Sequence, residues 1–536
     1  MKRTVAEFTR FDAFLQRIQP LSPYGREALK EMKLYTHRGE LERWFNAIQL
    51  LISLMNDDPV GKDRIEYHLG RLPVLPDPGQ KDLAGDDFFL LKRFLAHFRN
   101  ISELLTEEIR DRFAIHFRSD TLLDRLSLDG SIESFRICDA YSENLTVFRR
   151  KLRELDFLIG EARKNHISQI RERTGLDFSN RDFLILDADK AMVLPSGICY
   201  REPYDTKCFL VRPIMPESYY SLYAERDRDS DLEKQEEFRI ISTLIKEVNA
   251  CREEIGVYTR GIVEFEKAWL FSSSALRYAM IRPGLLPDGE ALRIRKGRFL
   301  PLFFECEERG VEYQPLSFSQ ETAVSVIRGS NMGGKTILLE TVGFFQLLVQ
   351  YGFFVPAEEC QVPLFDSIKV IAATSRERPA RGLSSFGMEI RSLMDALAPA
   401  GEQTLILIDE FAGTTTSDEA RALIEALIET MLQRGIHALL TTHILDLDLP
   451  GSVRLYRMKG LRKEGLRDSL NSSKGKELEE RIRLLNRSMI YMAEPEEISE
   501  RVPDALIIAD CLGLDREIVC RAAKKMGLKD ECAKQS

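Results

Sequence analysis

The sequence predicts a multidomain protein in which a mostly helical N-terminal region is followed by an α/β domain with a phosphate-binding loop. The chain has 536 residues, 44% of them apolar and 30% charged, which suffices for about three folded domains. Up to about residue 290 apolar residues recur at helical spacing, whereas apolar strands alternate with helices beyond it. We therefore expect a helical region at 1–290, an α/β domain at 291–525 and a C-terminal tail at 526–536.

Composition excludes several classes of protein. Lys and Arg number 76 against 85 Asp and Glu, a net charge of −9, which argues against a strongly basic nucleic-acid coat but leaves a local basic channel open. The nine cysteines are scattered, so neither a disulfide framework nor structural zinc is predicted. No uncharged apolar run reaches the roughly 18–20 residues that span a bilayer. We expect a cytoplasmic protein without a membrane partner.

The helical region contains two long stretches of helical periodicity. Apolar residues recur every three or four positions over 140–158, and a second such stretch runs from 232 to 265. Between them, the short apolar runs Phe183–Leu186 and Phe209–Val211 are separated by prolines and a glycine. The pattern predicts a small strand-containing insertion near 182–223 between two long helices.

The α/β domain begins with a strand that leads into a glycine-rich loop. Residues 323–327 and 404–408 are near-continuous apolar runs, as expected of strands buried on both faces of a parallel sheet. Glycines let backbone N–H groups turn inward around phosphate oxygens, and the following helix N-terminus favours negative charge. Lys335 would contact the β- and γ-phosphates of ATP, and the Thr336 hydroxyl would bind Mg²⁺. The loop consists of Gly329, Ser330, Asn331, Met332, Gly333, Gly334, Lys335 and Thr336.

The second and third strands also end in residues that can carry chemistry. Asp409 and Glu410 follow the strand 404–408, where Asp409 would hold Mg²⁺ through water and Glu410 would orient or deprotonate the attacking water. His443 follows the apolar run 438–442. A lone histidine is more often structural, but at a strand tip beside the other motifs we interpret it as a γ-phosphate sensor.

Two further segments have open interpretations. By itself, the segment 383–389 is typical of a helix N-terminus capped by Ser384 or Ser385. Tyr313 precedes the first strand of the domain and would either stack on adenine or pack as a buried aromatic residue.

These segments, in this order, resemble the ATPase domain of the MutS family, a branch of the ABC-type ATPases. The phosphate loop 329–336 is similar to the family's GPNMGGK[ST], and 384–390 is similar to its STFMxEM signature. Residues 352–357 match its GxxVPA stretch, and Thr442-His443 its histidine motif. The resemblance is specific over about 290–525 and looser toward the N-terminus.

The resemblance implies an ATPase that uses ATP and Mg²⁺ and works as a homodimer, or as a heterodimer with a related subunit. Each phosphate loop would face Ser384 and Ser385 of the other copy, and ATP-driven closure would move the helical region. Two departures accompany it. Phe411–Ser417 replaces the family's [IL]GRGTS and lacks the arginine, and the helical core starts too near Met1 to leave room for the mismatch-reading and connector domains.

The resemblance implies DNA as cargo, in mismatch repair or in binding recombination-related structures. Basic clusters at 149–153 and 163–173 could contact phosphates, or could be solvated helix faces balanced by nearby acids. The alternative is an ATP-dependent factor that remodels or reactivates an enzyme client, such as a cobalamin-dependent aminomutase, without binding DNA. A scaffold with an inactive nucleotide site is disfavoured because Lys335, Asp409, Glu410 and His443 are all present.

Overall fold

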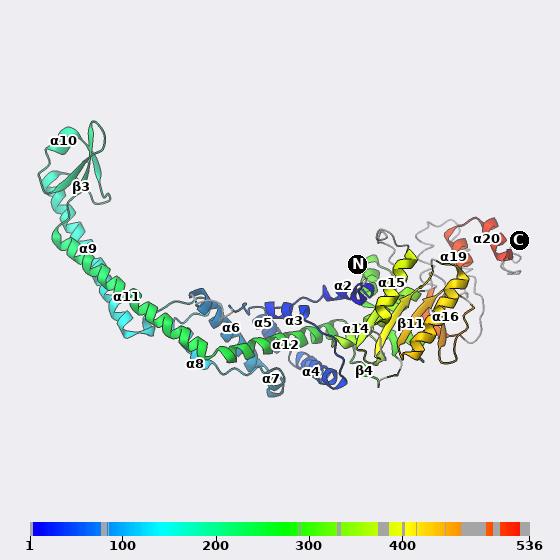
Figure 1. Cartoon of the computed structure of the whole chain (residues 1–536). Helices are drawn as coiled ribbons and strands as arrows, with labels where there is room; N and C mark the ends of the chain where they lie inside the picture. The colour runs from blue at the N-terminus through cyan, green and yellow to red at the C-terminus, as the bar shows by residue number, and fades with distance from the viewer. Residues whose placement is uncertain are drawn as a thin grey trace. The chain divides into compact units, whose positions relative to one another are not determined.

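The computed structural model divides into two compact units (Figure 1). Unit 1 comprises Met1–Glu66, Glu107–Phe113 and Ile262–Ser536, and unit 2 comprises Tyr67–Thr106 and Ala114–Gly261. The residues that the structure describes are 4–76, 83, 85–287, 289–290, 292–329, 334–372, 385–398, 403–413, 415–444, 446–461, 489–496 and 504–525. The predicted tail at 526–536 lies outside them, and the predicted domain division at 290/291 stays a prediction.

Unit 1 is built on a ten-stranded mixed sheet. Its strand order is β4-β8-β5-β6-β13-β12-β7-β11-β10-β9, and β12, β7, β11, β10 and β9 run parallel. The strands are β4 (Gly284–Leu285), β5 (Arg293–Gly297), β6 (Leu316–Ser319), β7 (Val324–Arg328), β8 (Glu359–Val362), β9 (Ser367–Ala372), β10 (Thr404–Asp409), β11 (His437–Thr442), β12 (Arg454–Leu461) and β13 (Met489–Pro495). The three strands predicted from apolar runs are β7, β10 and β11, so the predicted parallel α/β arrangement is confirmed.

Helices cover both faces of the parallel strands (Figure 1). α16 (Ser417–Gln433) buries Ile424 and Ile428 in one core with Ile406 and Ile408 of β10. On the other face α14 (Lys335–Gln350) approaches so closely that a Cβ on Gly343 would lie 2.7 Å from Leu407 Cδ1. Burial on both faces explains why β7, β10 and β11 read as continuous apolar runs. Among the described residues, the other helices after β5 are α13 (Leu300–Arg309), α15 (Ser385–Leu397), α19 (Asp504–Leu512) and α20 (Arg516–Lys525).

N-terminal helices pack in unit 1 beside the sheet domain. A buried carboxylate of α12 fixes one of them: Glu266 accepts hydrogen bonds from the backbone N–H groups of Leu21, Ser22 and Gly25 at the start of α3. Such an anion satisfies backbone donors that a helix N-terminus leaves unpaired. The helices are α1 (Val5–Phe8), α2 (Phe11–Leu15), α3 (Pro23–Lys30), α4 (Arg38–Asp57), α5 (Pro59–Leu69), α7 (Glu107–Phe113) and α12 (Arg252–Arg277).

Unit 2 consists of helices and a three-stranded antiparallel sheet of order β1-β3-β2. The sheet lies in sequence between α9 and α11, which pack together through many ion pairs. The stretch 232–265 was predicted as continuously helical, but the structure ends α11 at Ala250 and starts α12 at Arg252. The elements are α6 (Gly85–Leu104), α8 (Asp120–Leu126), α9 (Glu143–Thr174), β1 (Leu184–Asp187), α10 (Ala188–Met192), β2 (Cys199–Pro203), β3 (Cys208–Pro213) and α11 (Glu217–Ala250).

A buried ion pair in unit 2 makes a testable contribution to stability. Lys92 has no exposed side-chain surface and donates to Asp129 and to the Ser134 carbonyl oxygen. We expect Lys92→Ala to lower the free energy of unfolding by about 1.5–3 kcal/mol, because it removes a charge-assisted hydrogen bond and leaves the Asp129 carboxylate with only its backbone N–H donors. The exposed Lys164→Ala should cost about 1 kcal/mol or less. Denaturant titration followed by circular dichroism measures both, and equal midpoints would contradict the expectation.

The same carboxylate gives unit 2 a pH dependence. Burial raises the pKa of Asp129, but hydrogen bonds from Lys92 and from the N–H groups of Ser131 and Arg136 outweigh it, so the pKa lies below the ordinary value of 3.8. A carboxyl whose pKa is lower in the folded state stabilises the fold above its unfolded pKa and loses that contribution as pH falls through its folded pKa. The acid loss of stability should therefore be smaller in Lys92→Ala.

Candidate nucleotide site

Gly329 and Gly334 of the phosphate loop occupy positions where a side chain would be strained or crowded. β7 ends at Arg328, and Gly334 has a φ of 85°, which disfavours a side chain. A Cβ on Gly334 would lie 2.6 Å from Tyr491 Cδ1, and one on Gly329 would lie 3.2 Å from Met458 Cβ. Strands β12 and β13 thus back the loop closely. The predicted loop residues Ser330, Asn331, Met332 and Gly333 lie outside the described residues.

Lys335, the first residue of α14, lies at the centre of the site. Its ammonium donates to the Gly329 carbonyl oxygen at 2.8 Å, and Nζ lies 3.1 Å from His443 Nε2 and 3.3 Å from Glu410 Oε1. Only 1% of the side chain is exposed. Burial lowers the pKa of Lys335, and the Glu410 carboxylate opposes that shift. The ammonium is therefore held between the Gly329 carbonyl oxygen and the Glu410 carboxylate.

Thr336 and Asp409 present oxygen atoms to one another beside the loop. Thr336 Oγ1 donates to Asp409 Oδ2 at 2.9 Å, and Thr441 Oγ1 donates to Asp409 Oδ1 at 2.8 Å. Burial raises the pKa of Asp409, against the hydrogen bonds from the two threonines. A hydroxyl and a carboxylate at this distance suit Mg²⁺, which prefers oxygen ligands. Thr441 was not identified from the sequence, although it adjoins the predicted Thr442-His443 motif.

Glu410 adopts a left-handed backbone conformation that turns its carboxylate toward the other groups. Its φ is 52°, its N–H donates to Thr441 Oγ1 at 3.1 Å, and Oε1 lies 2.7 Å from His443 Nε2. For a residue with a side chain this conformation costs about 1–3 kcal/mol and is found mainly at functional sites. The left-handed conformation coincides with the end of β10 at Asp409, so Glu410 is the first residue outside the sheet.

The segment after the acidic pair is held by a carboxylate that the sequence did not single out as a ligand of this loop. Ala412 also has a positive φ of 60°, and its N–H donates to Glu389 Oε2 at 3.0 Å. Glu389 lies on α15, the helix that begins at the signature residue Ser385. Ser384 and the side chain of Ser385 lie outside the described residues, so their predicted contacts across two copies stay a prediction.

Tyr313 packs as a structural residue. Its hydroxyl accepts a hydrogen bond from the Phe299 N–H at 2.7 Å, and its ring meets Phe303 edge-on. Burial raises its pKa to about 12. The packed-aromatic interpretation is favoured over adenine stacking.

In the described part of the chain, no group of three or more His, Cys, Asp or Glu could hold a metal ion. No helix there is long and apolar enough to cross a bilayer.

The helix that carries Lys335 is fastened at its other end to an N-terminal helix of unit 1. Gly352, just after α14, accepts a 3.0 Å hydrogen bond from Trp44 Nε1 of α4. Gln350 Nε2 donates to the Tyr35 and Phe365 carbonyl oxygens. A shift of α14 on phosphate binding would therefore alter the surroundings of the buried Trp44 indole.

Tryptophan fluorescence tests this link, because the chain has only two tryptophans. We expect ATP to change the emission of the wild type and of Trp269→Phe, whereas Trp44→Phe should lose most of that change. Removing the indole donor leaves the Gly352 carbonyl unpaired and should also cost about 1–3 kcal/mol of stability. An unchanged ATP response in Trp44→Phe would show that α14 does not move at this end.

Comparison with known proteins identifies the domain that carries this site. The family model for MutS domain V matches residues 325–455, which include Lys335, Asp409, Glu410 and His443. A DNA mismatch repair protein MutS of Thermus aquaticus is 31% identical over 235 residues, 44% of this chain and 27% of that protein. The corresponding protein of Natronomonas pharaonis is 26% identical over 426 residues, 75% of this chain and 48% of that protein.

A second kind of relative covers more of the chain. Endonuclease MutS2 of Streptococcus pneumoniae is 23% identical over 476 residues, 84% of this chain and 58% of that protein. The chain thus spans between about a quarter and three fifths of the length of these relatives. The resemblance inferred from the motifs is confirmed for the domain that carries the site: residues 325–455 are the ATPase domain of the MutS family, MutS domain V.

Proposed function

We propose that this chain binds ATP with Mg²⁺ at residues 329–336 and hydrolyses it. The observation that carries the proposal is the convergence of Lys335, Glu410 and His443 within 3.3 Å of one another beside the loop. Lys335 would leave its present partners to bind the β- and γ-phosphates. Glu410 would accept the proton of the attacking water, and His443 would contact the γ-phosphate.

Thr336 and Asp409 are the residues that would hold Mg²⁺. The 2.9 Å hydrogen bond between them shows that a hydroxyl and a carboxylate already face the same point. When bound, the ion neutralises charge on the phosphate oxygens.

We further propose that two copies share the nucleotides and that ATP binding closes them. Ser384 and Ser385 of one copy would contact the γ-phosphate held by the other. Shifting a pair from mostly open to mostly closed requires about 5.5 kcal/mol of differential binding. Charge-assisted hydrogen bonds contribute about 1.5–3 kcal/mol each, so two to four such contacts suffice.

Subunit mixing tests the shared site. We expect Ser385→Ala and Glu410→Gln to be inactive separately, whereas a mixture should regain part of the activity. In a mixed pair, one of the two sites combines the intact Glu410 of one copy with the intact Ser385 of the other. No recovery, under conditions where labelled subunits demonstrably exchange, would contradict a site built from two chains.

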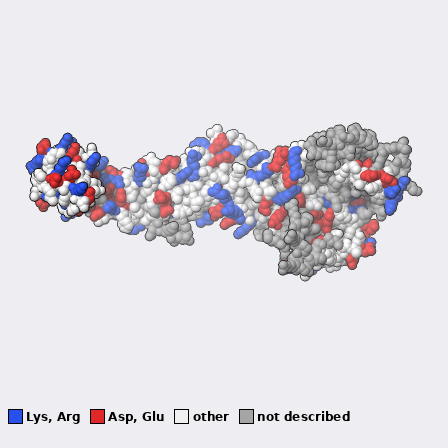
Figure 2. Space-filling model, turned by 90° about the horizontal axis from the view of Figure 1, so that it is seen from above, with Lys and Arg blue, Asp and Glu red and all other residues white. Residues whose placement is uncertain are grey.

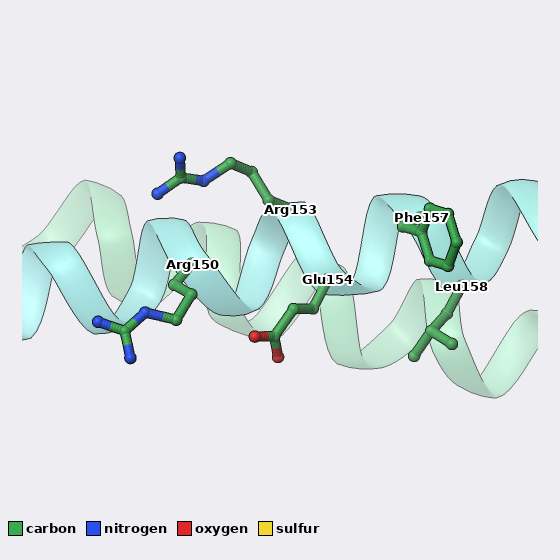
Figure 3. Close-up of a pocket in the computed structure, with 5 residues that line it drawn as sticks. All are labelled: Arg150, Arg153, Glu154, Phe157 and Leu158. Atoms are coloured by element: carbon green, nitrogen blue, oxygen red, sulfur yellow. The ribbon is translucent and has the colours of Figure 1, made fainter.

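DNA is the cargo we propose first. The relatives are named for DNA mismatch repair and as an endonuclease, and α9 exposes Arg150 and Arg153 (Figure 3). Phosphate contacts by such residues supply most of the non-specific affinity for DNA.

A protein client is the second candidate, and the charges of unit 2 favour it. Most predicted basic residues are neutralised within the chain: Arg149 contacts Asp139, Glu233 and Glu237, and Lys151 contacts Glu225 and Asp229. α9 contains eight Lys and Arg against five Asp and Glu, but α11 contains five against nine. Figure 2 accordingly shows basic and acidic side chains interspersed along the helical part of the molecule rather than a basic stripe.

The rate of ATP hydrolysis distinguishes the two cargoes. Stimulation by branched or mismatched duplex DNA, weakening steeply with salt and lost in an Arg150→Ala/Arg153→Ala variant, would support DNA. Arg228→Ala on the acidic helix α11 is the matched control. A rate unaffected by any of these duplexes at low salt would exclude DNA as the activator and leave the protein client.

A further inference from the structure

The outer face of α9 carries exposed apolar and charged side chains for which the described part of the chain supplies no partner. Phe157 is 69% exposed and Val147 is 54% exposed, whereas Leu145, Leu155 and Ile159 of the same helix are buried. Arg150 and Glu154 lie between them, are exposed, and make no ion pair or side-chain hydrogen bond within the described residues. The side chains of Arg150 and Glu154 project to the same side of α9 (Figure 3).

The order of these residues along the helix is self-complementary. Val147, Arg150, Glu154 and Phe157 follow one another at steps of three, four and three, so they form a single stripe at the spacing of a coiled-coil seam. Read in one direction the stripe is apolar, basic, acidic and apolar, and in the other it is apolar, acidic, basic and apolar. An identical helix laid antiparallel on it therefore meets an apolar residue with an apolar one and each charge with its opposite.

We propose that this stripe is a contact surface for the same helix of a second copy of this chain. The pairing is antiparallel and two-fold symmetric about position 152, which places Val147 opposite Phe157 and Arg150 opposite Glu154, each twice. Reciprocal contacts of this kind are what a two-fold interface between identical chains requires. The inference concerns unit 2 alone and does not rest on ATP binding or hydrolysis.

Neighbouring charges are compatible with this register. Glu143 would face Glu161 at each end of the stripe, but Lys164 lies 3.7 Å from Glu161 and supplies a compensating charge. Lys151 is engaged by Glu225 and Asp229 of α11 and so adds little repulsion. An identical helix matches both charges of the stripe, whereas the phosphates of duplex DNA would attract Arg150 but repel Glu154.

The area of one stripe is small beside the roughly 800 Å² per partner of a standard interface, so covalent capture is a better test than sedimentation. Phe157 is replaced by the photoreactive p-benzoylphenylalanine in the full-length chain, which keeps an aromatic side chain there. Irradiation, with and without a non-hydrolysable ATP analogue, should yield a covalent dimer in which residue 157 is joined to the peptide containing Val147. The same amino acid at Phe238, an exposed aromatic of α11, is the matched control and should give little dimer.

Charge exchange then separates specific pairing from random collision. Arg150→Glu and Glu154→Arg each place like charges opposite one another and should lower the yield of cross-linked dimer about tenfold. The double variant restores opposite charges at both positions and should recover the yield. Helix content by circular dichroism confirms that each variant is folded.

The proposal is overturned if no dimer is captured at residue 157 under any of these conditions, or if residue 157 captures added duplex DNA or a segment other than the one around Val147. Failure of the double variant to recover the yield would also overturn it. ATP turnover is measured in the same samples, so loss of the pairing with normal turnover leaves the proposed ATPase standing. Pairing without turnover would instead refute the ATPase proposal alone.

Discussion

Glu410→Gln is expected to retain ATP binding and to lose hydrolysis by a factor of about 10²–10⁴, the usual contribution of a general base. Glutamine keeps the size of the side chain and an oxygen that can accept the 2.7 Å hydrogen bond from His443 Nε2, but it cannot take a proton from water. Because ATP would still bind, the variant should accumulate in the ATP-bound, closed form. Single-turnover hydrolysis and equilibrium binding of a fluorescent ATP analogue measure the two steps separately.

Glu429→Gln provides the control for that substitution. Glu429 is an exposed carboxylate on α16, outside the site, and its replacement should leave both binding and turnover unchanged. Wild-type hydrolysis in Glu410→Gln would remove Glu410 from the role of base. The water would then have to be positioned by another group, such as His443.

Lys335→Ala is expected to lower the affinity for ATP by about a hundredfold or more. The lysine would make at least two charge-assisted hydrogen bonds to phosphate oxygens, at about 1.5–3 kcal/mol each. Its loss also leaves Asp409 and Glu410 without the nearby cation, so their negative charges would oppose a triphosphate. Isothermal titration calorimetry with ATP and Mg²⁺ measures the change in affinity.

The controls for Lys335→Ala are its melting temperature and the replacement of a second lysine of the same sheet. The melting temperature of Lys335→Ala should not fall strongly, because burial already lowers the pKa of Lys335 and so opposes its charged form. Lys369→Ala, on β9 of the same sheet, should bind ATP as the wild type does. Unchanged affinity in Lys335→Ala would contradict the assignment of the phosphate loop.

The order of motifs along the chain is sufficient to predict that the main site residues meet. Parallel strands present their carboxyl ends at one edge of a sheet, and β7, β11 and β10 are neighbours in that sheet. The loop bearing Lys335, the strand end at His443 and the acidic pair at Asp409 and Glu410 must therefore converge. The need for glycine at positions 329 and 334 follows from local backbone chemistry, so it can also be inferred from the sequence without a structure.

Other features depend on contacts between segments far apart in the sequence. Thr441 and Glu389 bind the acidic pair and the loop after it, and Trp44 fastens the far end of α14. Each is an ordinary residue type whose role arises only when distant elements pack together.

For the charges of α9, too, the sequence and the tertiary structure give different information about function. In the sequence alone, the basic clusters at 149–153 and 163–173 suggest a DNA-binding surface. Periodicity indicates which residues share a helix face, but it does not reveal which side chains of other elements lie opposite them. The register between α9 and α11 decides that Arg149 and Lys151 meet carboxylates, whereas Arg150 and Glu154 remain exposed beside Phe157. Local sequence thus suffices for the phosphate-binding chemistry, and the tertiary structure decides which charges stay available to a partner, since only packing determines which are already neutralised.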